Sequence, residues 1–78
     1  MHSIGMQRPL AVMMRSAAQT ISPDATACDA ARQMRAAKVG ALLVREGTSY
    51  LGIVSEADLV RKVLAESLAP AHTLVRSV

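Results

Sequence analysis

Apolar and polar residues alternate in short blocks along this chain, and each block has the pattern of one helix or strand. Residues 19–21 are predicted to form a short extended segment that ends at Ser22-Pro23, because the residue before a proline avoids the helical conformation. A helix is predicted after Thr26, which has the capping-box spacing with Asp29. Gly40 is the predicted stop of this helix, since glycine adopts the left-handed conformation cheaply. The apolar residues of this predicted helix recur at helical spacing, at Ala27, Ala31, Met34 and Ala37.

Two apolar runs follow, residues 41–44 and 50–54, separated by the polar, glycine-containing linker 45–49. This pattern predicts two adjacent strands joined as a hairpin. A second helix is predicted to begin at Ser55, which repeats the capping-box spacing with Asp58, and to end before Pro70. Its predicted apolar stripe consists of Leu59, Val60, Val63 and Leu64, with Arg61, Lys62 and Glu66 facing outward.

The predicted fold is therefore α/β, a small three-stranded sheet with two helices in the order β-α-β-β-α. Residues 1–9 are predicted to be a flexible lead-in, and residues 10–68 a single structural motif. Residues 69–78 are interpreted as a C-terminal tail that resembles residues 8–14 and so looks like the start of a second motif. The expected arrangement is one motif that pairs with another.

Composition supports the expectation of pairing. The chain has 78 residues, and a domain of that size buries only about 60% of the surface that its unfolded chain exposes. Tyr50 is its single aromatic residue, so the core must be built from aliphatic side chains and Met. We therefore expect stability to depend on a partner, either a second copy in a homodimer or a second motif.

Charge and residue inventory exclude several classes of function. The net charge of +3 is spread along the chain without stacking aromatics, which argues against nucleic-acid binding. No stretch approaches the about 20 apolar residues of a membrane helix and no signal peptide is evident, so we expect no membrane contact and a cytoplasmic location. Cys28 is alone and is interpreted as a small core residue, while His2 and His72 lie near opposite ends. Neither a metal site nor an enzyme is predicted, and no cofactor is required.

The stretch Gly52–Leu59 carries the most chemical information, because a strand runs directly into a helix there. The start of a helix offers unpaired N–H groups to an anion such as phosphate, and Ser55 can add a hydroxyl. Asp58 can accept hydrogen bonds from the two hydroxyls of a ribose. The alternative is that Ser55 and Asp58 only cap the helix, as Thr26 and Asp29 do.

Four segments in register resemble a motif of the CBS (cystathionine-β-synthase) domain family: Ser22–Thr26, the Ala-rich helix to Met34, Val39–Val44 and Gly52–Leu59. The resemblance implies that two motifs pair and hold an adenosine ligand (AMP, ADP, ATP or S-adenosylmethionine) in the cleft between them. It assigns phosphate contact to Ser55 and ribose contact to Asp58. It also places six positions at the adenine end: Gln19, Thr20, Val39, Gly40, Ala41 and Ile53.

The chain departs from the family pattern at two places. Leu43 stands where proline is frequent, and Gly40 and Ala41 stand where some nucleotide-binding members have basic residues. The predicted function is a regulatory module that couples the state of an adenosine ligand to a partner or attached effector. The alternative is a structural dimerisation module that binds no ligand.

Overall fold

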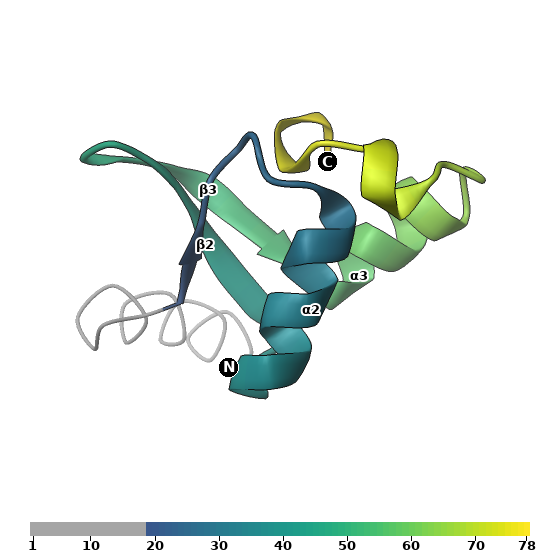
Figure 1. Ribbon diagram of the computed structural model, residues 1–78, viewed down its shortest axis with the longest axis horizontal. Helices are drawn as coiled ribbons and strands as arrows, with labels where there is room; N and C mark the ends of the chain where they lie inside the picture. The colour runs from purple at the N-terminus through teal and green to yellow at the C-terminus, as the bar shows by residue number, and fades with distance from the viewer. Residues whose placement is uncertain (1–18) are drawn as a thin grey trace, which may run out of the picture.

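The computed structural model describes residues 19–78, which form a three-stranded sheet with helices packed on one face (Figure 1). The strands are β1 (Thr20–Ile21), β2 (Ala41–Glu46) and β3 (Ser49–Ser55). Helix α2 (Ala27–Ala37) connects β1 to β2, and α3 (Glu56–Leu59) follows β3. This order confirms the predicted α/β fold. The predicted lead-in, 1–9, and the first part of the predicted motif, 10–18, lie outside the described residues.

Strand β2 lies at the centre of the sheet, with β1 parallel to it on one side and β3 antiparallel on the other. The hairpin is longer than predicted, because pairing extends through Arg45 and Glu46 and leaves a turn at Gly47, whose φ is 60°. The register shifts after Val44, so that Leu51 has no partner on β2. This β-bulge strengthens the local twist of the hairpin.

Helix α2 begins as predicted but ends on a different residue. The Thr26 hydroxyl accepts a hydrogen bond from the Asp29 backbone N–H, and the Asp29 carboxylate accepts one from the Thr26 N–H, which completes the capping box. Lys38, with φ 57° and ψ 44°, is the left-handed residue at the C-terminus, so the prediction of Gly40 as the stop was wrong. The Lys38 N–H donates to carbonyls of the last turn, which ends the helix before Gly40 is reached.

The second helix changes its winding after one turn. Helix α3 is followed without a break by a π-helical segment, Val60–Leu64, in which the Ala65 N–H donates to the Val60 carbonyl. Val63 is buried, but Val60 and Leu64 expose 54% and 61% of their surfaces. The predicted apolar stripe is therefore buried on only one side, and its other side faces outward.

The core lies between the sheet and α2. The side chains of Leu42, Val44 and Val54 form its sheet side, and Ala30 and Met34 form its helix side. Leu59 packs against the same cluster, so both helices cover one face of the sheet. The core contains no buried polar or charged residue among those described.

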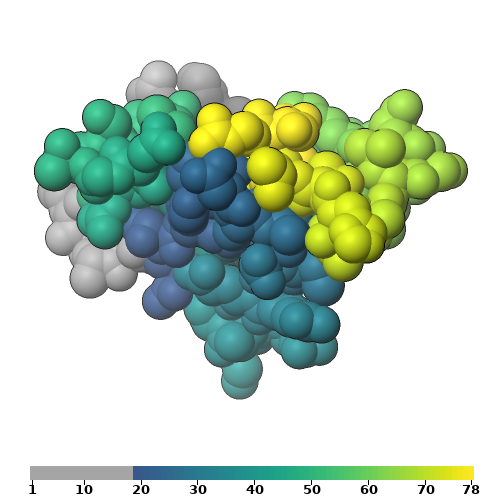
Figure 2. All heavy atoms as spheres, turned by 45° about the horizontal axis from the view of Figure 1, so that its top comes forward, coloured from purple at the N-terminus to yellow at the C-terminus, as the bar shows by residue number. Residues whose placement is uncertain are grey.

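The C-terminal segment, residues 69–78, is part of the folded motif. It contains two short 3₁₀ turns, Pro70–His72 and Val75–Ser77, and its Val75 is buried in the core cluster. The N–H groups of Val75 and Arg76 donate to the carbonyls of Ala25 and Pro23. Figure 2 shows the yellow end of the chain lying directly on the blue residues that begin α2. His72 in this segment is exposed.

Candidate functional site

Ser55 and Asp58 form a complete capping box at the point where β3 ends and α3 begins. The Ser55 backbone N–H and hydroxyl donate to the same carboxylate oxygen, Asp58 Oδ2, at 2.9 and 3.0 Å. The Asp58 N–H donates back to Ser55 Oγ at 3.2 Å. The hydroxyl thus uses its only proton on Asp58, so it must turn away from the carboxylate before it can donate to a phosphate.

The Asp58 carboxylate is held in its charged form. The hydrogen bond from the Ser55 backbone N–H lowers the pKa of Asp58 below its usual value, partial burial opposes this, and the Ser55 hydroxyl and Lys62 add to the lowering. Lys62 Nζ lies 3.6 Å from Asp58 Oδ1, and it also donates to the Val78 carbonyl at 3.1 Å. Since Oδ2 already accepts two hydrogen bonds, Oδ1 is the oxygen with room for a further donor.

Strand pairing places three of the six predicted adenine-end residues, Thr20, Ala41 and Ile53, on one face of the sheet. Leu43 lies between Thr20 and Ile53 in one row across the three strands. Ala41 lies opposite Ser55, and these two residues are each two positions along the strand from Leu43 and Ile53 respectively. Because side chains alternate along a strand, one face of the sheet carries all five of these side chains. We call this face, which points away from α2, the outer face, and define it by Thr20, Ala41, Leu43, Ile53 and Ser55.

Gly40 is tied directly to the start of α3. Its carbonyl accepts a hydrogen bond from the Glu56 N–H at 3.0 Å. A Cβ atom at position 40 would lie 3.1 Å from Glu56 Oε1, so glycine allows the two segments to approach closely. This contact leaves Ala57 as the first-turn residue whose N–H is not already used by Gly40 or Ser55.

The remaining predicted residues are placed less uniformly. Gln19 is exposed just before β1, and its carbonyl accepts from the Leu43 N–H at 3.0 Å. Val39 packs against the core cluster, so its side chain belongs with the interior rather than with the outer face. Sequence reasoning missed Gln33, whose side chain contacts Gln19 and Thr20 from α2, and no short-range pattern marks that contact.

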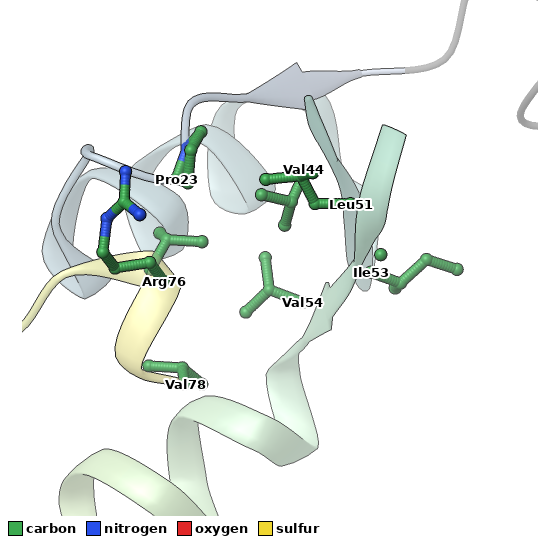
Figure 3. Close-up of a pocket in the computed structure, with 9 residues that line it drawn as sticks. Pro23, Val44, Leu51, Ile53, Val54, Arg76 and Val78 are labelled. Carbon is green, nitrogen blue, oxygen red and sulfur yellow. The ribbon is translucent and has the colours of Figure 1, made fainter. Parts of the chain in front are cut away.

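A cavity of about 350 Å³ lies elsewhere, between the hairpin and the C-terminal segment. Figure 3 shows Val44, Leu51 and Val54 on one wall and Pro23, Arg76 and Val78 on the other, with Ile53 directed to the opposite side of β3. Ile53 is the one predicted site residue that borders this cavity. The cavity and the outer face are therefore separate features.

Other kinds of site find no support within residues 19–78. No group of three or more His, Cys, Asp or Glu side chains there is arranged to hold a metal ion. Within the same range, no helix is long and apolar enough to cross a membrane. Cys28 is half-buried near the start of α2.

Comparison with known proteins identifies the family. The sequence model of the CBS domain family matches residues 6–65, which is more than half of the chain. The chain therefore belongs to the CBS domain family. The CBS domain-containing protein CBSCBSPB2 of Arabidopsis thaliana is 40% identical over 73 residues, which cover 92% of this chain and 14% of that protein. The chain thus spans a small part of this curated relative.

Solved structures agree with the sequence comparison. A putative signal-transduction protein with CBS domains from Burkholderia ambifaria is 33% identical with a TM-score of 0.74, over 77% of this chain and 44% of that one. A hexameric CBS-CP12 protein from bloom-forming cyanobacteria is 36% identical with a TM-score of 0.68, over 77% and 36%. CBS domains are in general regulatory or ligand-sensing modules that commonly pair with a second CBS motif.

Proposed function

We propose that this chain is a non-enzymatic regulatory module that binds an adenosine nucleotide on its outer face, in a cleft completed by a second CBS motif. The observation that carries the proposal is that an ionised Asp58 is hydrogen-bonded to Ser55, which lies on the outer face with Ala41 and Ile53. A charged carboxylate with an available oxygen suits the vicinal hydroxyls of a ribose. Ile53 is 40% exposed and lies two residues before Ser55 on the same face of β3, where it offers an apolar surface for a flat base.

Residues at the phosphate end favour a ligand of low charge. Gly40 and Ala41 carry no charge, and Lys62 is already engaged by Asp58 and the Val78 carbonyl. A phosphate here would contact the Ser55 hydroxyl after it turns and the Ala57 N–H. We therefore expect AMP to be bound at least as tightly as ATP.

The natural test is calorimetric titration with AMP, ADP, ATP and S-adenosylmethionine. Asp58→Ala should abolish binding, whereas Asp29→Ala should leave it unchanged. Asp29 is a close match as a control, because it closes the other capping box with the same two backbone-to-side-chain hydrogen bonds but lies at the start of α2. Equal loss of binding in both variants, or no binding by the wild type, would refute the proposed site.

A second candidate, a structural association module without a ligand, is favoured by one observation. Val60, Leu64 and Leu68 expose between 46% and 61% of their surfaces along and just after the π-helical segment. An exposed apolar surface on a small domain marks an interaction site. Wild-type protein that self-associates but shows no heat with any of the four ligands would favour this candidate.

A further inference from the structure

Glu56 directly follows Ser55 and lies opposite Gly40. The register that pairs Ala41 with Ser55 continues by one residue, because the Glu56 N–H donates to the Gly40 carbonyl at 3.0 Å. The side chain of Glu56 also lies against this residue, since a Cβ atom at position 40 would be 3.1 Å from Glu56 Oε1. The carboxylate therefore occupies the space that a side chain at position 40 would enter.

This arrangement places a negative charge where some relatives have a positive one. Gly40 stands at a position where some nucleotide-binding members of the family have a basic residue. Within residues 19–78, the Glu56 carboxylate belongs to none of the ion pairs, whose cations are Lys62 and Arg76. Its charge is thus left uncompensated by the described part of the chain, and it adds to the charge of Asp58 two residues further on.

We propose that Glu56 is a specificity-determining residue, which selects adenosine ligands by the charge of the group on the 5′ carbon of the ribose. The inference rests on the proposed nucleotide site, in which Ser55 and Ala57, the two neighbours of Glu56, contact that group. Each further phosphate brings more negative charge near the carboxylate, whereas a cationic group is attracted to it. The site should thus disfavour ATP relative to AMP and favour the sulfonium group of S-adenosylmethionine.

Glu56→Gln tests the proposal, because it removes the charge of an exposed side chain and keeps its size. Calorimetry at low salt without divalent cations should show that uncharged adenosine binds the variant and the wild type equally, within about 2-fold. AMP should bind the variant about 3-fold more tightly and ATP about 10-fold more tightly, as expected for removal of one exposed like charge at short range. Both gains should shrink at high salt, because ions screen the repulsion.

Glu66→Gln is the matched control. It makes the same change of net charge at an exposed position just after the π-helical segment, away from Gly40 and Ser55 in the sequence. This variant should bind adenosine, AMP and ATP as the wild type does. Melting temperatures of both variants establish that they are folded at the temperature of the titrations.

A cationic ligand gives the decisive readout, because its affinity should change in the opposite direction. S-adenosylhomocysteine lacks only the methyl group that makes the sulfur of S-adenosylmethionine a cation. The wild type should bind S-adenosylmethionine about 3-fold more tightly than S-adenosylhomocysteine, and this preference should disappear in Glu56→Gln. A change in stability alone cannot raise affinity for an anion and lower it for a cation.

The outcomes separate this inference from the function on which it rests. Absence of binding of every one of these adenosine compounds by the wild type would overturn the proposed function and the inference together. If the wild type binds them and Glu56→Gln keeps the same affinity ratios among them, the inference alone is overturned. Equal gains in ATP affinity in Glu56→Gln and Glu66→Gln would also overturn it, because they would assign the effect to net charge.

Discussion

Arg76 donates a hydrogen bond from Nε to Asp24 Oδ1 at 2.9 Å, across 52 positions of sequence. The same guanidinium lies 3.7 Å from Glu46 Oε2, and the Arg76 backbone N–H donates to the Pro23 carbonyl at 2.9 Å. Through these contacts the C-terminal segment closes over the loop between β1 and α2. The hydrogen bond to Asp24 also raises the pKa of Arg76 above its usual value.

Removing this ion pair should have only a small effect on stability. Both side chains are largely exposed, and exposed ion pairs contribute little to stability. We expect Arg76→Ala to lower the free energy of unfolding only slightly at low salt, and by less at high salt because ions screen the pair. Urea unfolding at two salt concentrations measures this, with Arg61→Ala as a control. A large effect that does not depend on salt would contradict the expectation.

Val75 should matter more than Arg76, although the two are neighbours. Val75 is 4% exposed and belongs to the core cluster, so Val75→Ala should cost about 2 kcal/mol through lost apolar contact and a small cavity. Leu74→Ala, at a side chain 38% exposed, is the matched control and should cost much less. Equal melting temperatures for the two variants would mean that the C-terminal segment contributes no core.

The two capping boxes should make stability fall in acid. Asp29 and Asp58 both have a pKa lowered in the folded state from the usual 3.8, chiefly by the backbone N–H of Thr26 and of Ser55 respectively. Their contribution is therefore complete above about pH 3.8 and is lost as the pH falls through the lower folded-state pKa. Thermal unfolding between pH 7 and pH 2.5 should show this loss as a falling melting temperature. The double variant Asp29→Asn/Asp58→Asn should show a smaller fall over the same pH range. If the melting temperature of the double variant falls with pH as steeply as that of the wild type, the acid sensitivity belongs to other carboxyl groups.

The outward side of the second helix should promote self-association. Val60 and Leu64 are four residues apart and exposed, so they present adjoining apolar surface. Leu64→Ser should weaken self-association in sedimentation experiments while leaving the melting temperature of dilute protein almost unchanged, because the side chain has little core contact to lose. Arg61→Ser controls for any change on the same helix. A wild type that stays monomeric at high concentration would contradict this prediction.

Local sequence patterns predicted the parts of the fold that depend on near neighbours. Thr26 and Asp29, and equally Ser55 and Asp58, form their hydrogen bonds within three residues, so their spacing was enough to predict both helix starts. The end of α2 was predicted wrongly because Lys38 takes a left-handed conformation that no residue preference requires. The strands were too short in the prediction because Arg45, Glu46 and Ser49 pair across the hairpin despite their polar character.

The candidate site was likewise predicted only where it depends on residues that are close in sequence. The sequence by itself determined the β-α-β-β-α order, the capping residues and the pairing of Ser55 with Asp58, because each rests on spacing of a few positions along the chain. Only the tertiary structure decided that Thr20, Leu43 and Ile53 form one row, that Gln33 on α2 contacts Gln19, and that Val75 completes the core. These contacts join residues on different elements, and strand register and helix packing, which bring such residues together, are set by burial of the whole core and not by local preference.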